Sequence, residues 1–331
     1  MSVDARARLA IAIPTYNRPL ILEQNLTAML PDLCRNRIPV YVSDDSTEAE
    51  TEAVVRRLAA RYELIHYKRN IPSLGHDGNF FQTVVMPDTD YVWYLGDSVF
   101  IKPGVLNQIL PLLDSDVDFC FVNAYKTGGA VEYVSPSDMR SFLRMRTWYL
   151  TLSGATIYGR RPRRLVVSDD SREDWTNFPQ LGLILEYCAK RSAHSYWFGP
   201  PGIGINTNKR SYWATSAFEV FVRDWSKLIR SFPQLFPDDV ASEVIRSHAR
   251  NTGLFGFKHL MFLRAHGVLS RSVLRQFEEE FSIATPSSLA YAKTLCLVPP
   301  QLLRFLAWSS RGLRGNSRMS ARGRSSARFL H

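Results

Sequence analysis

Three apolar runs in the amino-terminal third of the chain are each followed at once by a short polar segment. The pairs of run and polar segment are 9–13 with 14–18, 39–42 with 43–46, and 91–95 with 96–98. Short apolar runs bounded in this way are typical of buried parallel strands, and parallel α/β sheets bind ligands at the carboxyl ends of their strands. The sequence therefore predicts that the three polar segments meet in one crevice at an edge of a sheet.

Strand-like and helix-like patterns alternate as far as residue 125, which predicts an α/β fold built on a parallel sheet. We expect strands at 9–13, 39–42, 63–67, 90–95 and 117–123, and helices at 19–30, 48–62, 76–85 and 103–113. Glycine and proline in 124–147 favour a connection over the surface, and 148–158 is expected as another strand. A further apolar helix should begin within 174–180 and run through Cys188.

The polar segments resemble the signatures of the family 2 glycosyltransferases. Ile13-Pro-Thr-Tyr-Asn-Arg18 is similar to the family's first-strand signature, Ser43-Asp-Asp-Ser46 to its Asp-Asp-Gly-Ser element, and Gly96-Asp-Ser98 to its Asp-x-Asp region, with Pro103-Gly-Val-Leu106 following at a similar spacing. The resemblance covers roughly residues 8–190. It implies a GT-A fold, which is a Rossmann-like nucleotide-diphospho-sugar transferase fold, and transfer of a sugar from a nucleotide-sugar donor with inversion at the anomeric carbon.

The resemblance also implies which residues contact the nucleotide. They are Asp44 and the four consecutive residues Pro14, Thr15, Tyr16 and Asn17. A carboxylate at Asp44 suits this task because the imide N–H of uracil or thymine needs an acceptor. The alternative is that Asp44 and Ser46 only cap the helix that follows them.

A second polar loop, 70–79, follows the expected third strand. Related enzymes place base and ribose contacts in the corresponding loop, which nominates Asp77 and, behind it, His76 and Asn79. The alternative is an ordinary Asx turn that caps the next helix.

The site for the diphosphate leaving group departs from the family pattern. Family members usually carry two or three acidic residues here, one of which coordinates Mg²⁺ or Mn²⁺, but alignment on Pro103 puts Ser98 where a metal-binding carboxylate is expected. We expect Asp97 to hold Mg²⁺ or Mn²⁺ as the single carboxylate, with water and phosphate oxygens. The alternatives are that arginine or lysine side chains replace the metal, or that catalysis has been lost. His259 and His266 are further candidate ligands.

The catalytic base is expected in the second half of this domain. Arg172-Glu-Asp-Trp175 resembles the Glu-Asp element in which the family often keeps its base, so Asp174 is the first candidate, followed by Glu173 and then by Asp169 and Asp170. A carboxylate can accept the acceptor's hydroxyl proton while a helix start fixes its position. The alternative is that these acids only stabilise a helix start.

Charge is distributed unevenly along the chain. Residues 1–208 carry 22 Lys and Arg against 23 Asp and Glu, whereas residues 209–331 carry 19 against 8. Beyond Lys209 the apolar pattern is helical, and the end of the chain is rich in Ser, Gly and Arg. We therefore expect a nucleotide-sugar-binding catalytic domain at 1–208, a helical extension at 209–308 and a basic, disordered tail at 309–331.

Several features bear on location. The four cysteines are widely spaced, the start of the chain has no secretory apolar region, and no run approaches 18 apolar residues, which favours the cytoplasm. Residues 300–308 are apolar and aromatic, and the tail after them carries six arginines without an acid. This combination predicts peripheral binding to the inner face of the cell membrane, in preference to a nucleic-acid arm, because Leu, Phe and Trp lie beside the charges.

Together these features predict an inverting glycosyltransferase that moves a sugar from a nucleotide-diphosphate donor to a saccharide or lipid-linked acceptor in surface polysaccharide synthesis. Nucleic acid is not expected as a partner. The alternative is a catalytically impaired protein of the same fold that still binds nucleotide sugars.

Overall fold

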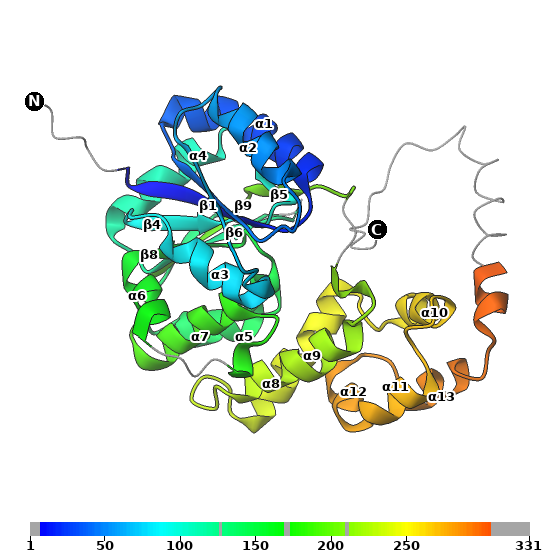
Figure 1. Ribbon diagram of the computed structural model, residues 1–331. Helices are drawn as coiled ribbons and strands as arrows, with labels where there is room; N and C mark the ends of the chain where they lie inside the picture. Colours follow the sequence, from blue (N-terminus) through cyan, green and yellow to red (C-terminus); the bar gives the residue numbers. More distant parts are fainter. Residues whose placement is uncertain (1–6, 126–127, 169–172, 209–211, 306–331) are drawn as a thin grey trace, which may run out of the picture. The chain divides into compact units, whose positions relative to one another are not determined.

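The computed structural model describes residues 7–125, 128–168, 173–208 and 212–305. The chain divides into two compact units, 1–209 and 210–331. The first unit combines strands and helices, and the second is helical (Figure 1).

An eight-stranded sheet forms the centre of the first unit, in the order β3-β2-β1-β4-β8-β6-β9-β7. Its strands are β1 (Leu9–Thr15), β2 (Val40–Asp44), β3 (Ile65–Arg69), β4 (Tyr91–Tyr94), β6 (Phe119–Asn123), β7 (Val131–Val134), β8 (Thr156–Gly159) and β9 (Ser195–Pro201). A separate antiparallel pair joins β5 (Val99–Ile101) to β10 (Ile203–Ile205).

The first four strands are parallel to one another, so their carboxyl ends share one edge of the sheet. Thr15 pairs in register with Asp44, and Asp44 pairs with Arg69. The apolar residues of β1 and β2 are almost fully buried, as the runs in the sequence predict. The first two polar segments therefore follow adjacent strands at the same edge.

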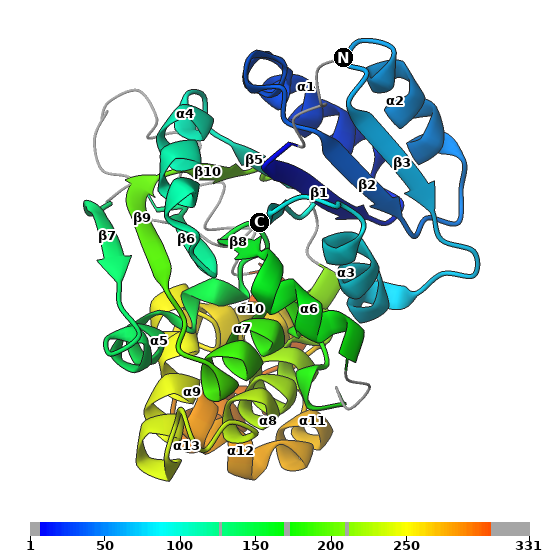
Figure 2. The same ribbon diagram turned by 90° about the vertical axis from the view of Figure 1, so that its left-hand side faces the viewer.

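Helices cover both faces of the sheet (Figure 2). Those on one face are α1 (Pro19–Asn36), α2 (Glu50–Ala59) and α4 (Val105–Ile109), and those on the other are α3 (Gly75–Val85), α6 (Arg160–Ser168) and α7 (Pro179–Lys190). Leu22 and Leu26 of α1 share one buried apolar cluster with Ile11 and Ile13 of β1. Full burial of such a side chain contributes about 1.5–3 kcal/mol, so these contacts hold the helix on the sheet.

Two sequence expectations were wrong between 124 and 158. The segment 124–147 contains β7 and α5 (Met139–Arg146), and within 148–158 only the part from Thr156 is a strand. The backbone turns at Gly154, where φ is +106° and an added Cβ would lie 2.8 Å from Val99 Cγ1. The Gly154 carbonyl also accepts a hydrogen bond from Trp93 Nε1 at 2.9 Å, which holds the turn against the core.

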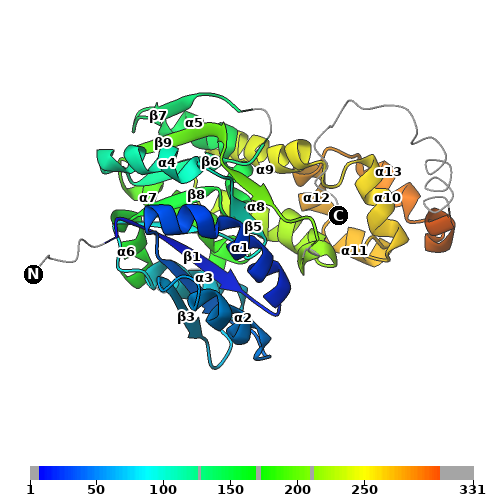
Figure 3. The same cartoon turned by 90° about the horizontal axis from the view of Figure 1, so that it is seen from above.

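The second unit is built from short helices around buried aromatic side chains. After a π-helical turn at Glu219–Asp224 come α8 (Trp225–Arg230), α9 (Asp238–Thr252), α10 (Phe257–Ala265), α11 (Arg271–Gln276), α12 (Glu278–Ala284) and α13 (Leu289–Leu295). Figure 3 shows α10, α11 and α13 grouped together. Phe218, Phe255, Phe277 and Phe281 pack on one another inside the unit. None of the helices in the described ranges combines the length and hydropathy needed to cross a bilayer.

Two buried histidines should make the second unit sensitive to acid. Burial lowers the pKa of His248 to about 3 and that of His259 to about 4, so both stay neutral in the folded state at neutral pH. In the unfolded chain each binds a proton near pH 6.5, so the free energy of unfolding should fall as pH drops from about 6.5 towards 4. His248→Phe, whose ring can stack on Phe221 as the imidazole does at 4.7 Å, should remove part of this loss. Urea unfolding of the wild type and of His248→Phe at neutral pH and at about pH 4.5 measures this loss. An equal loss in the two proteins would show that His248 does not cause the acid sensitivity.

Candidate functional site

The carboxylate of Asp97 lies beyond the carboxyl end of β4, beside the end of β1. Its Oδ2 accepts a hydrogen bond from the Thr15 hydroxyl at 3.3 Å, and its Oδ1 pairs with the Arg18 guanidinium at 3.1 Å. Asn25 of α1 donates from Nδ2 to the Asp97 carbonyl oxygen at 2.7 Å, which fixes the backbone. The first and third polar segments therefore meet at Asp97. Arg18 was not predicted as a site residue, although it ends the first motif.

A divalent metal would find one protein carboxylate here. Asp97 is the single acid between the end of β4 and the end of β5, and the neighbouring Ser98 is buried. Across the described ranges, no three His, Cys, Asp or Glu side chains gather as a metal cluster. Mg²⁺ can bind through one or two carboxylates together with substrate phosphates and water. Asp97 fits that single-ligand role, in which the metal and the Arg18 guanidinium would both contact its carboxylate.

The carboxylate of Asp44 is fully buried at the end of β2. Its Oδ1 accepts a hydrogen bond from the Ser46 N–H at 2.9 Å, and its Oδ2 accepts one from the Tyr67 hydroxyl at 2.7 Å. Burial, followed by the bond to Asp44, raises the pKa of Tyr67 well above its usual range, so the hydroxyl remains a donor. The next helix, α2, begins at Glu50 without a side-chain cap, so the alternative that Asp44 caps it is wrong.

Asp45 anchors the loop that follows β3, a role that the sequence did not reveal. Its Oδ1 accepts from the Leu74 N–H at 2.8 Å and from Asn70 Nδ2 at 3.1 Å. Its Oδ2 accepts from the Ser73 hydroxyl at 2.6 Å and from the Gly75 N–H at 2.9 Å. One buried carboxylate therefore fixes both the loop and the start of α3. Two adjacent aspartates look equivalent in sequence, and only their contacts in the fold separate them.

The first polar segment is tied to the second. Asn17 has a positive φ of 50°, and its N–H donates to the Ser46 hydroxyl at 2.8 Å. The Thr47 N–H donates in turn to Asn17 Oδ1 at 3.1 Å. Pro14 is half-buried in β1, whereas Tyr16 is exposed with its ring available to a ligand. The structure thus brings all four residues of 14–17 to the edge where Asp44 lies.

Asp77 lies in the first turn of α3 and reaches a distant part of the chain. Its Oδ2 accepts a hydrogen bond from the Asn177 N–H at 3.0 Å, and its Oδ1 is 2.7 Å from His76 Nδ1. Asn79 points inward instead, since its Oδ1 accepts from the Ser43 hydroxyl at 2.6 Å. Asp77 therefore connects the loop after β3 to the segment that carries Asp174.

Asp174 is exposed on a 3-10 turn, Glu173–Trp175, whose last residue is firmly held. Trp175 is buried against Gly182 of α7, where an added Cβ would lie 2.3 Å from Trp175 Cδ2. A glycine at 182 is therefore required for this close approach. The side chain of Glu173, together with Asp169 and Asp170, lies outside the described part of the structure. Asp174 is thus presented to solvent from an anchored turn just before α7.

The C-terminal histidines behave as ordinary structural residues. His259 is buried, and its Nδ1 accepts a hydrogen bond from the Phe255 N–H at 2.9 Å. His266 lies just beyond the end of α10, with its Nδ1 2.9 Å from the Phe262 carbonyl oxygen. In the described ranges neither histidine belongs to a group of three potential metal ligands, so the structure gives no indication of a metal site at either one.

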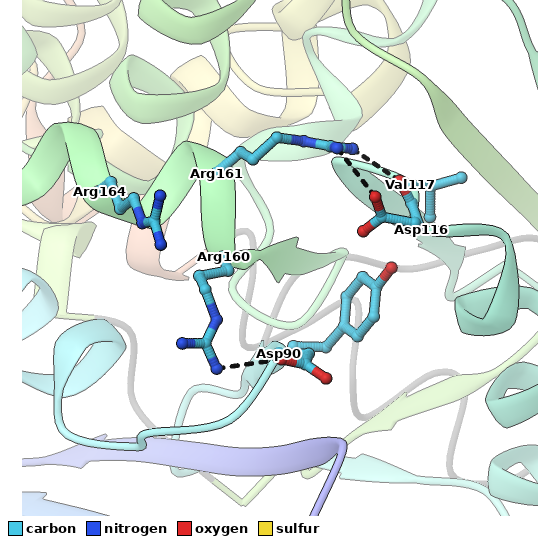
Figure 4. A pocket seen from close by; sticks show the side chains of 7 residues that line it. Asp90, Asp116, Val117, Arg160, Arg161 and Arg164 are labelled. Carbon is cyan, nitrogen blue, oxygen red and sulfur yellow. Dashed lines mark hydrogen bonds and ion pairs between the residues drawn. The ribbon is translucent and has the colours of Figure 1, made fainter.

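A cavity of about 190 Å³ lies at the other edge of the sheet, by the start of β4 and of β6. Figure 4 shows Arg160 directed at Asp90 and Arg161 at Asp116, each pair 3.0 Å apart. These ion pairs tie the start of α6 to the amino ends of the strands. The cavity is therefore separate from the edge that holds Asp44 and Asp97.

The strand edge combines groups that suit a phosphorylated nucleotide. Asp44 can accept an N–H, Asp97 can hold a cation, and the Arg18 guanidinium can pair with phosphate oxygens. Hydrogen bonds accepted by Asp45 hold the neighbouring loop after β3, and a hydrogen bond donated by Asn25 holds the backbone of Asp97. Such fixed loops reduce the entropy cost of ordering a ligand.

Comparison with known sequences agrees with this chemistry. Residues 10–170 match the family model described as Glycosyl transferase family 2. The abequosyltransferase RfbV of Salmonella typhimurium (strain LT2) is 32% identical over 139 residues, which are 41% of this chain and 41% of that protein. The chain thus matches about two fifths of the length of this curated relative.

Solved structures resemble the whole fold. TarS 1–349 of S. aureus has 14% sequence identity and a TM-score of 0.55 over 92% of both chains, and it is also solved with UDP and with UDP-GlcNAc. The mannosyltransferase PcManGT from Pyrobaculum calidifontis, solved with GDP-Man and Mn²⁺, has 16% identity and a TM-score of 0.52 over 89% of this chain and 88% of that one. These likenesses confirm the expected GT-A α/β fold with a helical C-terminal region. By this match, residues 10–170 form a domain of glycosyltransferase family 2, within a fold that the solved structures share.

Proposed function

We propose that this chain is an inverting glycosyltransferase that uses a nucleotide-diphosphate sugar as donor. The observation that carries the proposal is the convergence of Thr15, Asp44 and Asp97 at one strand edge inside the segment that matches the family. Structural neighbours solved with UDP, UDP-GlcNAc and GDP-Man support a donor of this chemical class.

Each group has a distinct task in the proposed reaction. Asp44 binds the nucleotide together with Pro14, Thr15, Tyr16 and Asn17, and Asp77, in the first turn of α3, contributes a further contact to the base or ribose. The acceptor hydroxyl attacks the anomeric carbon from the face opposite the leaving group, and its proton passes to the carboxylate of Asp174 or, failing that, Glu173. The bond between the anomeric carbon and the diphosphate oxygen breaks at the same time, and the nucleoside diphosphate leaves with the electron pair. Inversion follows from this single displacement.

The leaving group needs positive charge, which two groups near Asp97 can supply. Mg²⁺ or Mn²⁺ held by Asp97 would neutralise charge on the diphosphate, as the Mn²⁺ complex of a structural neighbour supports. The Arg18 guanidinium, 3.1 Å from Asp97, can pair with phosphate oxygens itself. We favour the metal on Asp97, with Arg18 as a second contact.

A donor panel tests the proposal most directly. UDP-, dTDP- and GDP-sugars should be screened by thermal shift, because a ligand that binds the folded state raises the melting temperature. The stabilising donor should then be hydrolysed slowly without acceptor, with release of its nucleoside diphosphate. No stabilisation by any nucleotide sugar would contradict the proposal.

A second candidate function is nucleotide-sugar binding without turnover. It is favoured by one observation, the serine at position 98 beside an Asp97 that is already paired with Arg18. Binding of a donor without hydrolysis or transfer, in the presence of Mg²⁺ and Mn²⁺, would support this candidate against the first.

The acceptor and location are also proposals. The name of the relative RfbV, an abequosyltransferase, supports a saccharide acceptor in surface polysaccharide synthesis, and we propose that the acceptor is lipid-linked. The catalytic domain would act in the cytoplasm, at the inner face of the membrane, with 209–308 as an extension and the basic segment 309–331 as an anchor. This last segment lies outside the described residues.

Asp44→Asn should weaken nucleotide binding about tenfold or more, because an amide cannot supply the same pair of acceptor oxygens. It should also destabilise the fold by about 1–3 kcal/mol, since the Tyr67 hydroxyl or the Ser46 N–H loses its partner. Tyr67→Phe is the matched control, because it removes one of these bonds and keeps the carboxylate. Titration calorimetry with the nucleoside diphosphate should show weakened binding in Asp44→Asn alone. Equal affinity in both variants would make Asp44 a purely structural residue.

A further inference from the structure

The second unit exposes large apolar side chains over a limited stretch of its sequence. Phe257, Phe262, Leu297, Leu302 and Phe305 have exposed fractions of 61%, 44%, 61%, 49% and 61%. In the described residues 213–256 of the same unit, no large apolar side chain is exposed to this degree. A gathering of exposed apolar side chains commonly marks contact with another surface.

Contacts within the unit bring these five side chains to neighbouring segments. Arg264 donates from Nε to the Val298 carbonyl oxygen at 2.9 Å, and Arg304 donates from Nε to the Ala265 carbonyl oxygen at 2.6 Å. Phe257 of α10 stacks on Tyr291 of α13 with ring centroids 4.9 Å apart. The helix α10, the helix α13 and the helical residues 300–305 therefore lie side by side (Figure 3). We call the five exposed apolar side chains, which lie on α10, on the turn after α13 and on residues 300–305, the α10–α13 surface.

The charge around the α10–α13 surface is positive. The described residues 281–305 carry Lys293 and Arg304 and no Asp or Glu, and residues 253–277 also lack acids. Lys258, Arg271, Arg275 and Arg304 are exposed on the described part of these segments. The acids at 278–280 form one short cluster, and Glu278 is paired with Lys293 at 2.5 Å.

This combination of groups matches the boundary of an anionic bilayer. Phenylalanine and leucine side chains gain free energy when they leave water for the acyl region, while lysine and arginine extend to the lipid phosphates. Each basic residue near the surface adds to the attraction, and the few acids are confined to the short cluster at 278–280. The positive charge therefore favours a lipid surface over a second copy of this chain, which would bring like charge to the same face.

We propose that the α10–α13 surface binds an anionic lipid bilayer directly, with its apolar side chains entering the headgroup boundary. The folded second unit would then contribute to membrane binding in addition to the basic segment 306–331. The inference rests on the proposed function in one respect, because a lipid-linked acceptor would be reached at such a surface.

Vesicle co-sedimentation of the full-length chain tests the proposal. Phosphatidylcholine vesicles are used with and without phosphatidylglycerol, and binding is expected with the anionic lipid. The pairs Leu297→Ser with Leu302→Ser and Phe257→Ser with Phe262→Ser should each weaken binding by at least about tenfold, because apolar burial is lost. The matched control is Tyr133→Ser with Met145→Ser, two exposed apolar side chains of the first unit at 51% and 63%, which should bind as the wild type does.

A second full-length variant separates the surface from the tail. Replacement of the six arginines after residue 308 with glutamine should weaken vesicle binding. Some binding should remain, and adding either serine pair to this variant should reduce it further. If this variant no longer binds, or if both serine pairs bind normally, the tail alone is the anchor and the proposal is overturned. It is equally overturned if the serine pairs abolish self-association of the chain while vesicle binding persists.

Donor hydrolysis without vesicles distinguishes the two proposals. A chain that hydrolyses a nucleotide sugar and ignores vesicles overturns the lipid surface alone. A chain that binds vesicles through this surface and never releases nucleoside diphosphate overturns the proposed function alone.

Discussion

Asp97→Ala is expected to reduce sugar transfer by at least about a hundredfold while the fold stays intact. The carboxylate is the single acid between the end of β4 and the end of β5, and its partners are Thr15 at the end of β1 and Arg18 in the loop after it. Its removal would leave a metal without its protein ligand, and Arg18 without the partner that orients it. Initial rates with the donor identified by thermal shift measure the loss, and unchanged circular dichroism shows that the fold remains.

Arg18→Gln decides which cation stabilises the leaving group. If a metal on Asp97 does so, Arg18→Gln should keep most of the activity, and the wild type should respond to Mg²⁺ or Mn²⁺ and fail in chelator. If the guanidinium replaces the metal, Arg18→Gln should be as damaging as Asp97→Ala, and chelator should have no effect. Full activity of Asp97→Ala itself would contradict both assignments.

Asp174→Asn is expected to leave donor binding unchanged and to reduce transfer by at least about a hundredfold, the usual scale for loss of a general base. The side chain is exposed on a turn that Trp175 anchors against Gly182, so the amide should occupy the same place without accepting a proton. Donor affinity by calorimetry and single-turnover transfer rates separate the two effects.

Glu173→Gln is the matched control for this assignment. It removes one negative charge from the same 3-10 turn and should keep most of the activity if Asp174 is the base. A hundredfold loss in Glu173→Gln with near-normal rates in Asp174→Asn would transfer the role to Glu173. If neither change matters, the base lies elsewhere in the chain, and Asp169 and Asp170 become the next candidates.

The strand edge was predictable because parallel strands impose it. Once 9–13, 39–42 and 91–95 are neighbouring parallel strands, Thr15 and Asp44 lie at carboxyl ends on the same edge, and the structure pairs them in register. The family and fold were likewise predictable from short motifs, since each motif lies at a strand end. Local patterns also placed α2 and α3 within a few residues, although α1 continues to Asn36, through Pro31, beyond its expected end at Leu30.

The rest depended on contacts between distant residues. Nothing local distinguishes Asp45, which binds four groups of the next loop, from Asp44, which binds Ser46 and Tyr67. The pairing of Arg18 with Asp97 joins residues 79 positions apart. Strand β7 was not predicted because 124–147 is rich in turn-forming residues and an edge strand carries only a weak alternating pattern. The α10–α13 surface could not be predicted either, because a sequence does not show which helix faces pack together and which stay exposed.

The hydrogen bond from the Asn177 N–H to Asp77 spans 100 positions in the sequence and links the two halves of the proposed reaction. At one end is the loop expected to recognise the donor, and at the other is the turn that presents Asp174. A kinetic defect in an Asp77 variant therefore cannot be assigned to donor recognition alone, because KM for the donor and kcat for the acceptor step would shift together. A substitution in this loop that admits a new donor would therefore also alter the rate of the acceptor step. Changes of sugar specificity should arise more readily around Tyr16, which has no such connection in the described structure.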